Sequence, residues 1–459
     1  MKEFDVIVLG GGPGGYVAAI RAAKHGLNVA LIEKDEVGGT CLNRGCIPTK
    51  AFLHSSNLYH EASKGAGVGI NVSGLTYDFK KIAENKESVV KKLVGGVSGL
   101  LKANKVTLIK AKGVLKSGNE IEAGGETFHA KSIIIATGSI PATPPIPGSD
   151  LEGVMNSDGV LALKEAPASV VVVGGGVIGI EFATFFSQLG IDVTVLEFLP
   201  DILATLDKDA AKPVEKALKK SGVMIHTGVK VVKFEKSGKG LKTTYEDNGS
   251  EVSVESAIVI VATGRKPVTK EIGLEAAGVK VNERGFIETD LQMRTNVPGI
   301  YAIGDITGKI QLAHVASAQG IVAADVAAGL TAKIDYNAVP SCVYTTPEIA
   351  GVGLSESQAK DSGKKIKIGS FPVPANGRSI IHGATDGIAK LVIDETTGEI
   401  LGAHLCAPNA TEMIAGIVVA MNAEATVEEL SSSIFPHPTV SEVIMEAAED
   451  CEGMCIHKV

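Results

Sequence analysis

Two cysteines and a lysine stand close together near the start of this 459-residue chain. They lie in the segment Gly38–Lys50, whose sequence is GGTCLNRGCIPTK, with the thiols at Cys41 and Cys46. On a regular helix, residues at this spacing would lie ~7.5 Å apart along the axis and about 140° apart around it. A disulfide needs Cα atoms within roughly 4.4–6.8 Å. If the two cysteines bond, the backbone between them must be irregular, and the glycines and the proline of the segment supply the irregularity.

Lys50 follows Cys46 by four residues. On a helix that continues from Cys46, the two side chains share a face, and the lysine charge favours thiolate over thiol. One alternative is a structural disulfide, which is rare in a reducing compartment. Another is a zinc site, which would need a second pair of ligands nearby in the sequence, and there is none. We therefore expect the cysteine pair to be oxidised and reduced in turn, with no metal bound.

Two further segments read as a buried strand that runs into a glycine-rich turn and then a helix. Both have the spacing G-x-G-x-x-G, with the glycines at Gly10, Gly12, Gly15 and again at Gly174, Gly176, Gly179. In such a turn one glycine makes the bend, one lets the backbone approach a pyrophosphate, and one lets the helix pack on the strand. Helical sequence follows over Tyr16–His25 and Glu181–Leu189.

The two glycine turns are followed by matching acids. Glu33 and Glu197 each end a second strand, 23 residues after the first glycine of their turn, where the fold places the acid that binds ribose hydroxyls. A later strand in each copy, Ile133–Gly138 and Ile258–Gly264, ends in Ala-Thr-Gly. Two unrelated glycine-rich turns would not share these features, so we expect two dinucleotides, one held permanently and one exchanging. No Arg or Lys between Glu197 and Thr205 could meet a 2′-phosphate, which favours NAD over NADP.

The composition agrees with this interpretation. The length suggests about three domains, and the 54 glycines are about 12% of the chain against a usual ~7%. A net charge of −8 without a long basic run disfavours nucleic acid as a partner. The first strand begins near Phe4, which leaves no room for a signal peptide, and no apolar run is long enough to span a membrane. We expect a soluble, cytoplasmic protein, with a removed organellar presequence as the alternative.

Taken together and in order, these motifs resemble those of the pyridine nucleotide-disulfide oxidoreductases that carry a C-x4-C motif. The resemblance covers essentially the whole chain. Within that family the segment Gly38–Lys50 is similar to the dihydrolipoamide dehydrogenases, whereas glutathione and mercuric reductases usually have Val-Asn-Val-Gly-Cys-Val-Pro. The resemblance implies an FAD-dependent enzyme that oxidises protein-bound dihydrolipoyl groups and reduces NAD.

The resemblance also implies the architecture, an α/β fold with two Rossmann-like domains, a central domain and an α+β dimerisation domain. The expected boundaries are 1–147 for FAD, 148–265 for NAD, 266–335 for the central domain that completes the FAD site, and 336–459 for the interface. The sequence is compatible with them, because the Pro-rich stretch Pro141–Gly148 reads as a loop. After Tyr336 the pattern changes to strands with a turn at Asp394–Gly398 and a helix near Thr411–Ala423.

The resemblance assigns cofactor contacts to residues in both halves of the chain. The Tyr301–Ile306 segment looks like the family's second FAD motif. The expected FAD contacts are Gly10, Gly12, Gly15, Glu33, Lys34, Gly39, Thr40, Lys50, Gly113, Thr137, Gly138, Ser139, Asp305 and Ala313. The expected NAD contacts are Gly174, Gly176, Ile178, Gly179, Glu181, Glu197, Val231 and Gly264, with Ile178 and Glu181 near the nicotinamide.

A histidine near the end of the chain completes the expected site. Read alone, His437 between two prolines is more often structural than catalytic, but Glu442 could fix its tautomer and raise its basicity. The pair resembles the family's His-Pro-Thr-x-x-Glu dyad, which reaches the cysteines of the other subunit and so implies a homodimer. The family often has His-Ala before this histidine, where this chain has Phe435-Pro436.

The expected reaction follows from these roles. A dihydrolipoyl thiol gives its proton to His437, and its thiolate attacks Cys41 and releases Cys46 beside the flavin, near Lys50. The lipoyl group would arrive on a protein of a 2-oxo acid dehydrogenase, glycine cleavage or acetoin-cleaving complex. Another reductase of this fold stays an alternative because Cys451 and Cys455 could form a second thiol pair, although helix packing explains them as well. A non-enzymatic FAD-binding scaffold is the alternative from a different class.

Overall fold

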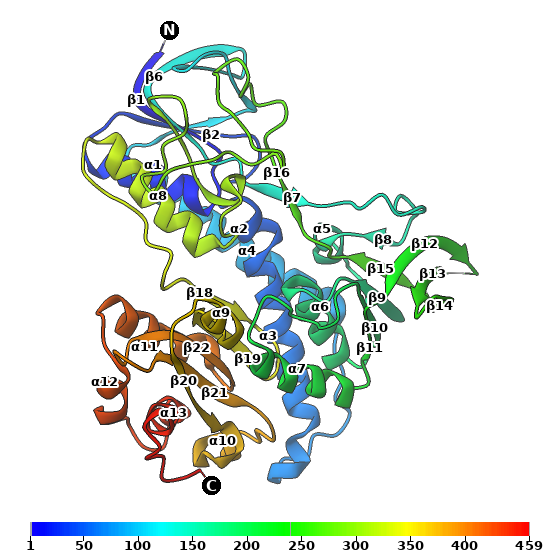
Figure 1. Cartoon of the computed structure of the whole chain (residues 1–459). Helices are drawn as coiled ribbons and strands as arrows, with labels where there is room; N and C mark the ends of the chain where they lie inside the picture. Colours follow the sequence, from blue (N-terminus) through cyan, green and yellow to red (C-terminus); the bar gives the residue numbers. More distant parts are fainter. Residues whose placement is uncertain (1, 239, 459) are drawn as a thin grey trace.

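The computed structural model describes residues 2–238 and 240–458, and its first sheet is built around the N-terminal strand (Figure 1). The strand order is β3-β2-β1-β6-β5-β4, with β17 paired to β6. Strands β1, β2, β3, β6 and β17 are parallel, and β4 and β5 are antiparallel additions. The bounds are β1 (Lys2–Leu9), β2 (Val29–Glu33), β3 (Thr107–Lys110), β4 (Gly113–Leu115), β5 (Glu120–Ala123), β6 (Glu126–Ile135) and β17 (Ile300–Ala302).

Both faces of this sheet are buried. Successive residues of a strand point to opposite faces, so Val6 and Val8 pack with residues of α1 (Pro13–Lys24) and α8 (Ala313–Ala327). Ile7 and Leu9 pack into a separate cluster on the other face. The continuous apolar run of β1 is therefore explained by a parallel sheet covered on both sides.

The second sheet is also built from parallel strands, in the order β11-β10-β9-β15-β8. A three-stranded antiparallel sheet, β12-β13-β14, lies beside it. The strand bounds are β8 (Val154–Met155), β9 (Ser169–Val173), β10 (Asp192–Glu197), β11 (Met224–Thr227), β12 (Lys230–Ser237), β13 (Gly240–Asp247), β14 (Ser250–Ser256) and β15 (Ile258–Val261). The helices are α5 (Ser157–Leu161), α6 (Val177–Gln188) and α7 (Lys208–Lys220).

The first sheet with its helices forms a first unit, and the second sheet with its helices forms a second unit. The two segments that connect these units lie side by side. Strand β7 (Ser139–Pro141) leads out, β16 (Arg265–Pro267) leads back, and the two pair antiparallel. The short 3-10 helix η2 (Gly304–Thr307) follows β17, which completes the first sheet. The predicted α/β fold with two Rossmann-like sheets is thus confirmed, and the second sheet is inserted between strands of the first.

The last third of the chain forms an antiparallel sheet, β18-β19-β22-β21-β20, covered by short helices. The predicted turn after β21 is present, because the Gly398 N–H donates to the Asp394 carbonyl at 2.9 Å. The strands are β18 (Pro340–Val343), β19 (Glu348–Gly353), β20 (Ile366–Pro372), β21 (Ile388–Asp394) and β22 (Ile400–Ala407). The helices are α9 (Glu356–Asp361), η3 (Val373–Ala375), α10 (Gly377–Ile381), α11 (Ala410–Asn422), α12 (Val427–Ser432) and α13 (Glu442–Glu452).

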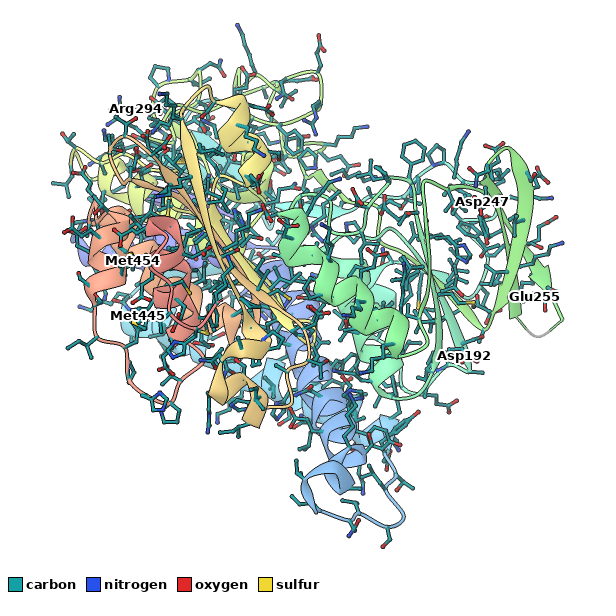
Figure 2. All side chains as sticks on the ribbon, turned by 60° about the horizontal axis from the view of Figure 1, so that its bottom comes forward. Asp192, Asp247, Glu255, Arg294, Met445 and Met454 are labelled. Atoms are coloured by element: carbon teal, nitrogen blue, oxygen red, sulfur yellow. The ribbon has the colours of Figure 1, made fainter. Side chains whose placement is uncertain are left out.

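The cysteine segment begins a long helical hairpin. Helix α2 (Gly39–Arg44) leads into α3 (Cys46–Ser63), then η1 (Gly65–Val68) and α4 (Phe79–Ala103). Figures 1 and 2 show the α3–α4 hairpin projecting from the body of the molecule. Stacked rings of Phe52 and Phe185, with centroids 4.8 Å apart, hold α3 against α6 of the second unit. Within the described ranges, no helix is both long and apolar enough to cross a membrane.

Helices α1 and α6 begin three and four residues earlier than the predicted starts at Tyr16 and Glu181. Both begin directly after the second glycine of their turn, at Pro13 and Val177. Proline fits the first helical position because its missing N–H has no partner there in any case. The glycine-rich turn is therefore partly helical, and its N–H groups belong to the helix N-terminus.

Candidate active site

A single cleft of about 2320 Å³ brings most of the predicted site residues together. Its volume is well above the ~300–1,000 Å³ typical of a pocket for one drug-sized ligand. The predicted residues that line it are Gly10, Gly12, Glu33, Lys34, Gly39, Thr40, Cys41, Cys46, Lys50, Gly113, Thr137, Gly138, Ser139, Asp305, Ala313, Gly174, Gly176, Ile178, Glu181, Glu197, Val231 and Gly264. Four predicted residues lie elsewhere: Gly15, Gly179, His437 and Glu442.

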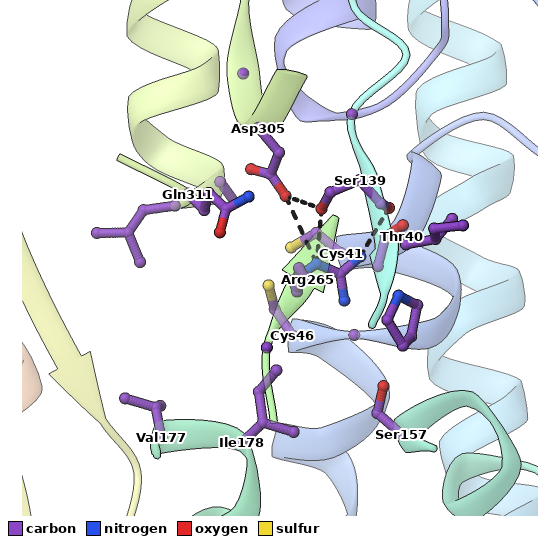
Figure 3. A pocket seen from close by; sticks show the side chains of 18 of the residues that line it. Thr40, Cys41, Cys46, Ser139, Ser157, Val177, Ile178, Arg265, Asp305 and Gln311 are labelled. Atoms are coloured by element: carbon purple, nitrogen blue, oxygen red, sulfur yellow. Dashed lines mark hydrogen bonds and ion pairs between the residues drawn. The ribbon is translucent and has the colours of Figure 1, made fainter. Parts of the chain in front are cut away.

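The cysteine segment is fixed against the first glycine turn. The Gly38 N–H donates to the Gly11 carbonyl at 2.8 Å. A Cβ added to Gly39 would lie 2.6 Å from the Gly12 Cα, so any larger residue there would clash with the turn. The irregular backbone predicted between the cysteines lies at Gly45, which separates α2 from α3 with φ −146° and ψ −113°. Both cysteines therefore face the cleft beside the turn (Figure 3).

The two thiols have opposite acid–base properties in this reduced state. The hydrogen bond from Cys41 lowers the pKa of Cys46 to about 7, helped by the Lys50 charge and opposed by burial. The same contact, together with burial, raises the pKa of Cys41. Cys46 is therefore the thiol of the pair that ionises first, and the thiolate is the reactive form of a cysteine.

Lys50 forms an ion pair with a residue of the second unit. Its ammonium lies 2.8 Å and 2.9 Å from the two carboxylate oxygens of Glu181. The Glu181 side chain is 4% exposed and that of Lys50 is 30% exposed. Lys50 continues the helix that begins at Cys46, as the spacing predicted. The ion pair therefore connects the cysteine helix with α6, the helix of the second glycine turn.

Glu33 and Glu197 hold the two glycine turns in the same way. Glu33 accepts from the Gly11 N–H at 2.6 Å and from the Asp35 N–H at 2.8 Å. Glu197 accepts from the Gly175 N–H and, at 2.6 Å, from the Leu199 N–H. Each carboxylate thus stiffens its turn and remains at the wall of the cleft.

The glycine turns fit the dinucleotides that the sequence predicts. Gly10 and Gly174 have φ of +107° and +113°, values that a residue with a side chain rarely adopts. Gly15 and Gly179 lie beneath the turns, where an added Cβ would fall 1.8 Å and 2.0 Å from the carbonyl oxygens of the first glycines. Neither α1 nor α6 has a side-chain cap on its first N–H groups. Those groups can bind pyrophosphate oxygens.

Arg265 is a polar residue of the site that the sequence interpretation missed. It donates to the Ser139 hydroxyl at 2.7 Å and to the Ser139 carbonyl at 2.8 Å. It also lies 3.7 Å from a carboxylate oxygen of Asp305, which accepts from the Ser139 hydroxyl (Figure 3). Its position directly after the second Ala-Thr-Gly was the available signal.

Histidine 437 and Glu442 form a pair, but away from the cysteines of the same chain. His437 Nδ1 lies 2.9 Å from Glu442 Oε1, and the Thr439 N–H donates to Glu442 Oε2 at 2.9 Å. Burial alone would raise the pKa of Glu442, but these two bonds, together with the charges of His437 and His457, lower it. The His437 side chain is 79% exposed and is outside the cleft. Within one chain, the pair therefore presents a free imidazole nitrogen to solvent.

Comparison with known proteins decides the family. Residues 4–320 match the family described as Pyridine nucleotide-disulphide oxidoreductase, and residues 339–448 match its dimerisation domain. The chain belongs to the pyridine nucleotide-disulphide oxidoreductases. It is 46% identical to the dihydrolipoyl dehydrogenase of Thermus scotoductus, with 100% of this chain and 99% of that protein covered.

Two solved structures are similar to the chain over nearly their whole length. LpdA of Mycobacterium tuberculosis has a TM-score of 0.90 at 29% identity, with 98% of this chain and 99% of that chain covered. The Cu(II) complex of the HOCl-induced flavoprotein disulfide reductase RclA of Escherichia coli has a TM-score of 0.87 at 30% identity, with the same coverage. FAD and NAD are the cofactors of this oxidoreductase family, as the sequence predicts.

Neither a disulfide nor a hydrogen bond joins the two C-terminal thiols of this oxidoreductase in the part of the chain that the structure describes. Cys451 is buried in the core of the last sheet, whereas the Cys455 thiol donates to Glu446 Oε2 at 3.1 Å. Burial raises the pKa of Cys451 to about 12 and that of Cys455 to about 11. Packing therefore explains both positions, and the arrangement gives no support to a second redox pair. Among residues 2–238 and 240–458, no group of three or more His, Cys, Asp or Glu could hold a metal ion.

Proposed function

We propose that this chain is a dihydrolipoyl dehydrogenase, which oxidises dihydrolipoyl groups on a carrier protein and reduces NAD. The observation that carries the proposal is the placement of Cys41 and Cys46 in one cleft with both glycine turns. The lowered pKa of Cys46 and the full-length similarity to dihydrolipoyl dehydrogenases support it.

The thiol chemistry requires an oxidised pair at the start. A dihydrolipoyl thiolate attacks the Cys41 sulfur, the Cys41–Cys46 disulfide breaks, and Cys46 leaves as a thiolate. The second lipoyl thiolate then attacks the mixed disulfide and releases Cys41, so the lipoyl group is oxidised as the cysteine pair is reduced. The Lys50 charge, which remains when Cys41 is bonded to the lipoyl sulfur, favours the Cys46 thiolate, and a thiol whose thiolate is stabilised is the better leaving group. This supports the leaving role for Cys46. Lys50 and the other predicted FAD residues would hold FAD beside this pair, and the flavin would supply the two-electron chemistry that connects the dithiol with NAD.

His437 would accept the protons of the dihydrolipoyl group, with Glu442 orienting its ring. The exposed position of His437 on this chain supports a role in the cleft of a second subunit. The match to a dimerisation domain supports a homodimer. In such a dimer each site would combine the cysteines of one chain with the dyad of the other.

The cofactor assignments are part of the proposal. Lys50 and Asp305 would contact FAD with the other predicted FAD residues, and the N-terminus of α1 would bind its pyrophosphate. Ile178 and Glu181 would lie near the nicotinamide, and the N-terminus of α6 would bind the NAD pyrophosphate. The division at residues 1–147, 148–265, 266–335 and 336–459 belongs to the same proposal and is supported by the pairing of β7 with β16.

The partner would be a lipoyl-bearing protein of a 2-oxo acid dehydrogenase, glycine cleavage or acetoin-cleaving complex. A cytoplasmic location stays a prediction, which cell fractionation would check.

Steady-state assays test the activity. The purified protein is given dihydrolipoamide, glutathione or mercuric ion, each with NAD(H) and with NADP(H). We expect turnover with dihydrolipoamide and NAD, and its loss in Cys41→Ser and Cys46→Ser. Cys455→Ser is the matched control, because it removes a thiol that lies outside the cleft. Turnover only with NADP(H), or none with the lipoyl substrate, would overturn the proposal.

A further inference from the structure

Tyr344 touches both members of the Lys50–Glu181 ion pair. It directly follows β18, in the last sheet, and lines the cleft. The Lys50 ammonium lies 4.5 Å from the centroid of its ring. Its backbone N–H donates to Glu181 Oε1 at 3.1 Å. Three separate parts of the fold therefore meet at one ammonium group.

The ring supplies what the ion pair by itself lacks. A lysine side chain is long and flexible, and a partly exposed ion pair contributes little free energy. The ion pair alone therefore holds the ammonium only weakly in place. The face of an aromatic ring attracts a cation, more strongly where water is excluded. Burial raises the pKa of Tyr344 to about 12, so its ring stays neutral at any working pH. Lys50 is thus held between a carboxylate on one side and a neutral aromatic face on another.

The position of Lys50 matters to Cys46. The Lys50 charge favours the Cys46 thiolate, whereas the nearby Glu181 charge disfavours it. If the ammonium moves away, the carboxylate remains and its unfavourable effect is no longer balanced. The other titratable groups that face this cluster are Cys41 on α2, Cys342 on β18, Glu348 on β19 and Glu412 on α11. None of these four groups carries a positive charge, so Lys50 is the one cation among the groups named.

We propose that Tyr344 is a positioning residue, which holds the Lys50 ammonium between its ring and the Glu181 carboxylate so that the lysine charge stays directed at the Cys46 sulfur. The inference rests on the proposed function, because it assigns Tyr344 a part in the same thiol chemistry.

Replacement of the ring tests this role in the FAD-loaded enzyme. Tyr344→Leu removes the aromatic face and keeps the backbone N–H to Glu181. Tyr344→Phe is the matched control, because it keeps both. The readout is the long-wavelength band that a thiolate beside oxidised flavin gives after two-electron reduction, titrated against pH. We expect the midpoint of Tyr344→Leu to rise by about one pH unit, and that of Tyr344→Phe to stay with the wild type.

An unchanged midpoint in Tyr344→Leu, or an equal shift in both variants, would overturn the proposal. Flavin content and the melting temperature show whether each variant is folded, and Tyr344→Met replaces Tyr344→Leu if it is not. If the wild type has no such band, the proposed function fails. The pH dependence of thiol alkylation then measures the same midpoint without the band, and the same outcomes decide the role of Tyr344.

Discussion

Glu33 and Glu197 accept the same two hydrogen bonds in two different parts of the chain. Each accepts from the N–H of the glycine between the first two motif glycines, Gly11 or Gly175, and from the N–H two residues beyond itself. The internal repeat therefore extends from the sequence motif to the hydrogen bonds that hold it. Because the two turns serve different cofactors in the proposed enzyme, the two acids can be tested separately.

The first prediction compares these two acids. Glu197→Gln keeps the size of the side chain but loses one acceptor and its charge, and a hydrogen bond to a charged group is worth about 1.5–3 kcal/mol. We expect the KM for NAD to rise roughly tenfold or more, with the FAD content unchanged. Glu33→Gln is the matched variant, and we expect it to lose FAD on gel filtration. Loss of the same cofactor in both variants would contradict the assignment of the two turns.

Short motifs made much of this site predictable from the sequence. The residues of each motif (a glycine turn with its acid, or the cysteine segment) lie within a few dozen residues of one another. The spacing of these residues is therefore enough to predict how they are arranged. Arg265 directly follows the second Ala-Thr-Gly, but its contacts could not be found in that way, and neither could Tyr344. Their partners Ser139 and Glu181 lie 126 and 163 residues away, and only the folded chain brings them into contact.

The helix starts show a second limit of the sequence. Glycine has a low helix propensity, so the turns read as loops and the helices were expected to begin later. In the structure Pro13 and Val177 begin these helices. Packing of the helix on the strand fixes that start, and propensity alone cannot reveal it. The exposed position of His437 was likewise beyond sequence reasoning on a single chain, and the family resemblance implied only that the dyad serves the other subunit.

The second prediction concerns the titration of Cys46. In the reduced enzyme we expect alkylation to accelerate as the pH rises through about 7. Cys41→Ala removes the hydrogen bond that contributes most to the lowered pKa, so the midpoint should rise toward the ordinary value of roughly 8.5. The fraction of thiolate at pH 7 then falls. The rate of iodoacetamide labelling at Cys46, followed by mass spectrometry, measures the midpoint.

Cys41→Ser is the control for this titration, because its hydroxyl can still donate to the Cys46 thiolate, and its midpoint should lie between the other two. Burial raises the pKa of Cys342 and Cys455 to about 11, so these thiols should stay unlabelled near neutral pH. A midpoint that does not change in Cys41→Ala would show that the thiol pair is not coupled.

The third prediction concerns a buried lysine that connects the second unit with the last sheet. Lys390, on β21, lies 3.2 Å from Asp207, 2.8 Å from Asp209 and 2.6 Å from Glu356, and its side chain is 3% exposed. Lys390→Met leaves the buried Asp207 without its cation, whereas Asp209 keeps Lys212 and Glu356 keeps Lys360. Loss of one partner of a buried ion pair costs about 3–5 kcal/mol. We expect a clear fall in the free energy of unfolding by urea. Lys364→Met is the control, because its ion pairs are partly exposed and worth under ~1 kcal/mol.

The fourth prediction concerns the subunit that supplies the base. His437→Asn should abolish turnover in its own homodimer, since general-base catalysis contributes about 10²–10⁴-fold. Cys41→Ser should abolish it as well, because it removes the sulfur that the lipoyl thiolate attacks. If the dyad acts across the dimer, a heterodimer of the two variants has one intact site, made of Cys41 from one chain and His437 from the other. Co-expression with two affinity tags isolates that heterodimer, and we expect about half of the wild-type activity per dimer. If the dyad serves its own chain, both sites of the heterodimer are defective and it stays as inactive as its parents.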